Sequence, residues 1–151
     1  MHLLLLAFVL FAQDAPLTNL TITGAESVVF TTSDTNACYI DDSNALNAQL
    51  TDATSGMIIS MRILATVGDH PAKSQLTALT LDGPSDNPFL NWSSSNGTVT
   101  LDDTSATVPI EAGDPMISAS THGVLGHIDA DLTSSQGSIH LSGPFACHSP
   151  T

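Results

Sequence analysis

Residues 123–147 read GVLGHIDADLTSSQGSIHLSGPFAC. Apolar and polar residues alternate on both sides of the polar segment 133–138, and a period of two is typical of a strand with one buried face. Both apolar faces point inward together when Leu132 pairs with Ile139. The stretch therefore predicts an antiparallel hairpin that turns within residues 133–138.

This register assigns a side to the residues of the hairpin. The inward set is apolar and includes a cysteine: Ile128, Ala130, Leu132, Ile139, Leu141, Phe145 and Cys147. The outward set is polar: His127, Asp129, Asp131, His140 and Ser142. Because residues i and i+2 of a strand point the same way, these histidines and aspartates share one face, with Asp131 opposite His140.

The rest of the chain is a series of short apolar runs between turn residues. Expected strands cover residues 18–23, 26–32, 37–40, 45–50, 57–67, 76–81, 89–92, 98–101, 106–110 and 116–120, ahead of the final pair at 123–132 and 137–145. Residues 45–50 also suit a helical turn capped by Ser43 or a preceding aspartate. The turn at 51–56 and the long run after it favour a hairpin instead.

Many short strands with Gly, Pro, Asn, Asp and Ser in the turns predict an all-β protein. We expect an antiparallel β-sandwich with one disulfide, with a closed β-barrel as the alternative. A chain of 151 residues has the length of one ordinary domain. The expected organisation is a lead segment at 13–25 followed by a single sandwich domain at 26–151.

The charge excludes two classes of partner. The chain has 15 acidic and 2 basic residues, which gives a net charge of −13. Two cations cannot form the basic stripe that displaces counterions from a nucleic-acid backbone, and an anionic membrane surface is excluded for the same reason. The hydrophobic fraction of 42% with a charged fraction of 11% indicates a packed domain rather than a disordered chain.

The first residues resemble a secretory signal. Residues 1–12 read MHLLLLAFVLFA, and this apolar run is shorter than the roughly 20 residues that a membrane span needs. We expect cleavage after Ala12 and a secreted protein, extracellular or periplasmic, with no membrane span in the mature chain. The alternative is a buried N-terminal strand or helix.

The chain has two cysteines, Cys38 and Cys147. In an oxidising compartment they have only each other as partners, so export predicts a disulfide between them. The alternative is a pair of unrelated buried thiols.

The cysteine placement and the C-terminal third together resemble a known family. A strand that ends in Cys38, the stretch GVLGHIDADL at 123–132 and the stretch GSIHLSGPFAC at 137–147 are similar to small secreted or lipid-anchored bacterial β domains of the mycobacterial 19 kDa lipoprotein antigen type. The resemblance implies a compact sandwich closed by one disulfide between an early strand and the last one. It implies no enzymatic site, and because the acylated cysteine of the lipoproteins is missing here, membrane anchoring does not carry over.

The sequence contains two candidate metal sites. His127, Asp129, Asp131 and His140 share the outer face of the last hairpin, where imidazole and carboxylate could bind zinc. Acidic turns at 41–42, 82–87 and 102–103 could bind calcium, but no EF-hand loop is present. The alternative for both is solvated polar surface and ordinary turn chemistry, so we expect no obligatory cofactor.

No catalytic motif is recognisable, since G-x-S-x-G, H-E-x-x-H, a P-loop and a dinucleotide fingerprint are all missing. Trp92 and Tyr39 are the only Trp and Tyr, and Trp92 is expected to fill the core or its rim. The sequence therefore predicts an exported, non-enzymatic envelope or extracellular module that binds an unknown protein or surface ligand or serves a structural role. The alternative is a secreted zinc- or calcium-binding protein.

Overall fold

The computed structural model describes residues 18–25, 27–31, 37–52, 54–74, 78–83, 92–110 and 119–148. These residues form ten strands and no helix, which confirms the all-β class. The strands are β1 (Asn19–Gly24), β2 (Val28–Thr31), β3 (Ala37–Ile40), β4 (Ala45–Thr51), β5 (Ile58–Leu64), β6 (Gly68–Pro71), β7 (Ala78–Asp82), β8 (Trp92–Ile110), β9 (Ala119–Ser134) and β10 (Gly137–His148). The expected signal at 1–12 lies outside the described residues.

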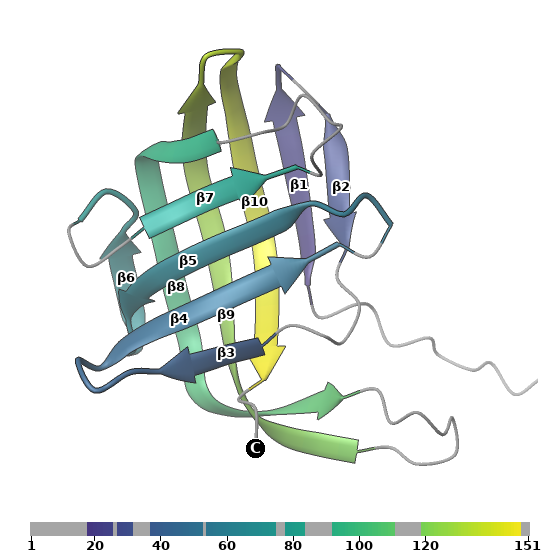
Figure 1. The fold of residues 1–151 in the computed structure, drawn as a ribbon. Coiled ribbons are helices and arrows are strands. Elements are labelled where there is room, and N and C mark those ends of the chain that lie inside the picture. Colours follow the sequence, from purple (N-terminus) through teal and green to yellow (C-terminus); the bar gives the residue numbers. More distant parts are fainter. Residues whose placement is uncertain are drawn as a thin grey trace, which may run out of the picture.

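Seven of the strands close into a barrel, in the order β3, β4, β5, β7, β8, β9 and β10. In Figure 1, β3, β4, β5 and β7 form one layer, and β8, β9 and β10 cross behind it. β1 and β2 extend the sheet from β10, and β6 lies against β8. β1 falls within the expected lead segment at 13–25, so the described part of that segment belongs to the sheet.

The barrel closes through two narrow seams. β7 meets β8 through two residue pairs, and β10 meets β3 through one parallel pair, His148 opposite Ala37. The closed barrel, which was the alternative to the sandwich, is therefore the architecture. Strand periodicity is the same in both folds, and they differ here in a few pairs at the layer edges that no local pattern encodes.

The two predicted hairpins are confirmed. Leu132 pairs with Ile139 and Asp131 with His140, as the alternation of residues 123–147 requires. β4 pairs with β5 around the turn at 51–56, so residues 45–50 form a strand and not a helical turn.

Several strands differ in extent from the prediction. Residues 98–101 and 106–110 belong to one strand, β8, because the polar residues between them form bulges rather than turns. β9 likewise continues without a break from Ala119 to Ser134. β6 was not predicted, since its sequence GDHP consists largely of turn formers.

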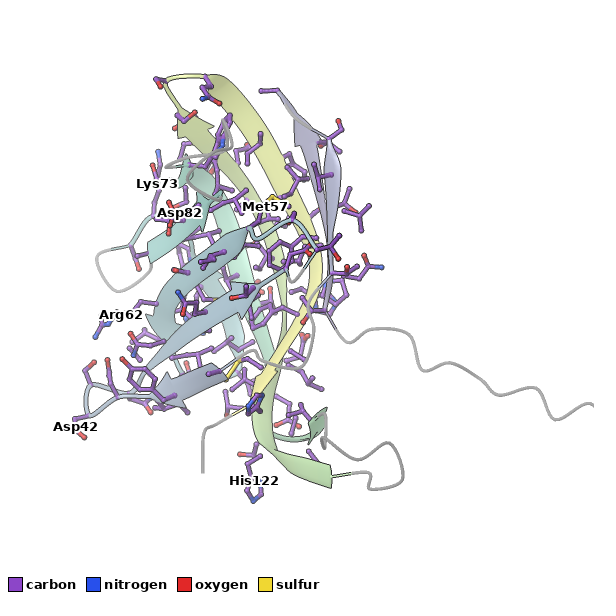
Figure 2. The ribbon with its side chains drawn as sticks, turned by 45° about the vertical axis from the view of Figure 1, so that its right-hand side comes forward. Asp42, Met57, Arg62, Lys73, Asp82 and His122 are labelled. Atoms are coloured by element: carbon purple, nitrogen blue, oxygen red, sulfur yellow. A yellow bond between two sulfur atoms is a disulfide. The ribbon has the colours of Figure 1, made fainter. Side chains whose placement is uncertain are left out.

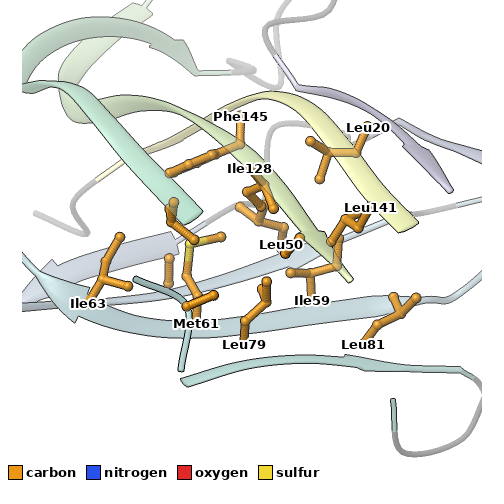
Figure 3. Packing of buried hydrophobic residues seen from close by; sticks show 14 of the residues in the cluster. Leu20, Leu50, Ile59, Met61, Ile63, Leu79, Leu81, Ile128, Leu141 and Phe145 are labelled. Carbon is orange, nitrogen blue, oxygen red and sulfur yellow. The ribbon is translucent and has the colours of Figure 1, made fainter. Parts of the chain in front are cut away.

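The core fills the space between the two layers. Figure 3 shows Leu50, Ile59, Met61 and Leu79 of the front layer facing Ile128, Leu141 and Phe145 of the layer behind. Burying one such side chain contributes about 1.5–3 kcal/mol. Trp92 is fully buried next to Leu81 at the β7–β8 seam, as expected of a core plug.

The predicted disulfide joins Cys38 of β3 to Cys147 of β10, with the two Cα atoms 5.6 Å apart. Both cysteines are buried, and Cys147 points inward as the hairpin register requires. The bond therefore crosses the seam that carries only one residue pair. The disulfide thus links β3 to β10 at the seam where the two strands share the fewest residue pairs.

Candidate functional site

The structure brings together part of the predicted metal set. His140 Nδ1 lies 2.9 Å from Asp131 Oδ1, and His140 Nε2 lies 4.0 Å from Asp129 Oδ1. All three side chains are substantially exposed on the outer face of β9 and β10. Surface pairs of this kind contribute up to about 1 kcal/mol.

His127 does not join this set. It lies four residues from Asp131 on β9, a separation of about 13 Å at the rise of a strand. Its Nδ1 atom instead lies 2.6 Å from Oδ2 of Asp102, at a bulge of β8. Within the described ranges, no three His, Cys, Asp or Glu side chains are placed to hold a metal ion.

Of the acidic turns, the one at Asp41 is explained by its own hydrogen bonds. The Asp41 carboxylate accepts from the backbone amides of Ser43 and Ala45 at 2.9 and 3.0 Å, and from Asn47 Nδ2 and Arg62 at 3.0 Å. Hydrogen bonds to this carboxylate hold the pKa of Asp41 well below its usual range. The largest contribution comes from the Ser43 hydroxyl, followed by Asn47, the Ala45 amide and Arg62. This carboxylate organises the β3–β4 turn and anchors the guanidinium. Residues 86 and 87 of a second acidic turn lie outside the described residues.

A different surface lies on the outer face of the front layer, where an open hollow of about 420 Å³ spans β3, β4, β5 and β7. Two rows of paired residues cross it. One row runs Tyr39, Asn47, Arg62 and Ala78, and the other runs Ala37, Gln49, Ser60 and Thr80. We refer to this surface, which these eight residues line together with Ala48 and Met61, as the front hollow.

The front hollow combines an aromatic ring with amide and hydroxyl groups. Tyr39 is 56% exposed, and Arg62 lies on the outer side of β5 in Figure 2. Gln49, Ser60 and Thr80 have no side-chain hydrogen bond within the described part of the chain. The surface thus offers a ring for stacking and polar groups that are free to bind a ligand.

The front hollow was not predicted from the sequence, although two of its residues are distinctive in the composition. Tyr39 is the only tyrosine of the chain, and Arg62 is its only arginine. The alternation around buried Cys38 places Tyr39 on the outer face, and that around Met61 and Ile63 does the same for Arg62. The hairpin of β4 and β5 was predicted, but the pairing of β3 with β4, which puts the two side chains on one row, was not.

Among the described residues, apolar side chains of the core pack against one another inside the barrel. Trp92 Nε1 is buried without a hydrogen-bond partner in the described residues, but its ring packs in the core. The front hollow is therefore the better candidate.

No family model, curated protein or solved structure matches the chain. Across the described ranges, no helix is long and apolar enough to cross a membrane. A function is therefore inferred from the residues of the chain itself.

Proposed function

We propose that this chain is an exported, non-enzymatic binding module of the envelope or the extracellular space, and that its working surface is the front hollow. One observation carries the proposal. The only tyrosine and the only arginine of the chain lie on one row of paired residues, beside unengaged amide and hydroxyl groups. A shallow surface that gathers scarce residue types in this way suits recognition of a ligand.

Export is supported by two features. The Cys38–Cys147 disulfide is of the kind that persists in oxidising compartments. The apolar run at 1–12 has the length and composition of a secretory signal.

Binding is favoured over catalysis by the chemistry of the front hollow. Its described lining contains no carboxylate, imidazole or thiol, which are the usual groups for proton transfer and nucleophilic attack. The Asp41 carboxylate, which contacts Asn47 and Arg62 of the lining, is engaged by five hydrogen-bond donors. Such a lining can hold and orient a ligand.

The proposal is tested by titrating the isotope-labelled protein with a library of small neutral, anionic and cationic fragments and recording amide chemical shifts. We expect the hits to shift the amides of Tyr39, Gln49, Ser60 and Arg62, while Val29 on β2 serves as an exposed control. Hits that gather at the His140 face, or a library without any hit, would contradict it.

A further inference from the structure

We propose that the front hollow binds a neutral carbohydrate, with the ring of Tyr39 stacked on a pyranose and the polar groups of β4, β5 and β7 bound to its hydroxyls. This inference rests on the proposed function, and it names the class of ligand for the same surface.

Charge selects against ionic ligands. Arg62 lies 3.0 Å from Asp41, so its charge is balanced within the protein. The rest of the lining is uncharged, and the molecule as a whole carries −13. An anion meets the repulsion of the whole molecule, and a cation, although the net charge attracts it to the molecule, finds no carboxylate in the lining to pair with. A neutral ligand is the one that this surface fits.

The aromatic ring supplies a platform for such a ligand. Tyr39 is more than half exposed, whereas the chain's single tryptophan, Trp92, is fully buried. The face of a tyrosine ring is apolar with a negative quadrupole, and it packs well against the slightly positive C–H face of a pyranose. Ala37, two residues before Tyr39 on β3, is small and leaves room beside the ring.

The unengaged polar side chains supply the hydrogen bonds. Gln49, Ser60 and Thr80 form one row across β4, β5 and β7, and neighbouring strands are about 4.8 Å apart. Side chains at this spacing can reach separate hydroxyls of one sugar ring. Amide and hydroxyl groups both donate and accept, as a sugar hydroxyl requires of its partners.

The size of the front hollow is consistent with one or two sugar units. Its volume of about 420 Å³ falls within the range of about 300–1,000 Å³ of small-molecule sites. Because it lies open on the surface of the sheet, a longer chain can continue beyond it on either side. A segment of polysaccharide therefore fits better than a free monosaccharide.

The test is calorimetric titration of the oxidised, full-length protein with maltotetraose, cellotetraose, mannotetraose and chitotetraose. We expect at least one to bind, and the affinity to stay constant when NaCl is raised from about 0.1 to 1 M, which shortens the Debye length from about 10 to 3 Å. Tyr39→Ala should weaken binding at least about tenfold, the equivalent of about 1.4 kcal/mol. Tyr39→Phe keeps the ring and should stay within about threefold of the wild type, about 0.7 kcal/mol. Val29→Ala, at an equally exposed site on β2, should change nothing.

The inference is overturned if no tetrasaccharide binds, if binding is lost at high salt, or if Tyr39→Ala binds as well as the wild type. Fragments that shift the front-hollow amides without any sugar binding would overturn the carbohydrate assignment and leave the proposed function standing. A protein that shows neither response would overturn both.

Discussion

The Cys38–Cys147 disulfide should hold the barrel closed, and its loss should destabilise the β3–β10 seam first. The bond closes a loop with a sequence separation of 109 residues, while β10 and β3 share a single residue pair. The chain-entropy model gives about 4–5 kcal/mol for a loop of this size. Since domains of this kind are stable by about 5–15 kcal/mol, the disulfide accounts for about a quarter or more of the stability.

The assay compares urea unfolding of the oxidised protein, the reduced protein and the double variant Cys38→Ala/Cys147→Ala. With a slope of about 2 kcal/mol/M, the midpoint should fall by about 2 M on reduction. The reduced protein keeps both sulfur atoms and so isolates the cross-link from the loss of buried side-chain volume. In hydrogen exchange, amides of β3 and of the end of β10 should exchange faster, while the β4–β5 hairpin should change least. A loss of stability below about 1 kcal/mol, or acceleration spread evenly over the sheet, would refute the reasoning.

Three further predictions concern single residues. Gly126→Ala should destabilise the protein by about 1–3 kcal/mol in urea, because the new Cβ would lie 2.6 Å from the Phe145 ring and 2.5 Å from a backbone oxygen; unchanged stability would contradict this close packing. Asp52→Ala leaves the backbone amides of residues 31, 54 and 55 without their acceptor. We therefore expect the free energy of unfolding to fall by about 1–3 kcal/mol and the amides of β2 to exchange faster. Hydrogen-exchange protection of β2 equal to that of the wild type would contradict this role of Asp52. Because its partners lower the pKa of Asp41 in the folded state, the carboxylate stabilises the protein above its unfolded pKa and loses this effect as the pH falls below about 4. Asp41→Asn should therefore flatten the acid side of a melting-temperature profile, with exposed Asp42→Asn as the control, and a profile that keeps the wild-type acid slope would contradict the role of Asp41.

Much of the fold could be predicted because the alternation of apolar and polar residues along each strand indicates which side chains point inward. The β9–β10 register followed from the inward positions of Leu132 and Ile139, and the disulfide followed from the presence of two cysteines in a chain that we expected to be exported. The closed barrel was the alternative to the sandwich, and the sequence could not decide between them because closure depends on three residue pairs at two seams. The continuity of β8 was missed for a related reason, since bulges and turns use the same polar residues.

The candidate site was harder to predict than the fold. The pairing of Asp131 with His140 lies within one hairpin and was correctly predicted. Tyr39 and Arg62 instead lie on one row that crosses three strands, and the register of β3 against β4 was not predicted. The residues of the predicted metal set share the outer face of the hairpin, but His127 and Asp131 lie too far apart on that face. Along a strand, side chains four residues apart are too far from each other to hold one ion.

The central claim is that a ligand binds against Tyr39. Its most direct test is the measurement of nuclear Overhauser effects between the Tyr39 ring and a bound tetrasaccharide, which are free of overlap from other tyrosines because the chain has only one. Cross-peaks between the Tyr39 ring protons and the pyranose C–H protons are the predicted result. A bound sugar whose cross-peaks lead to the His140 face, and none to Tyr39, would contradict it.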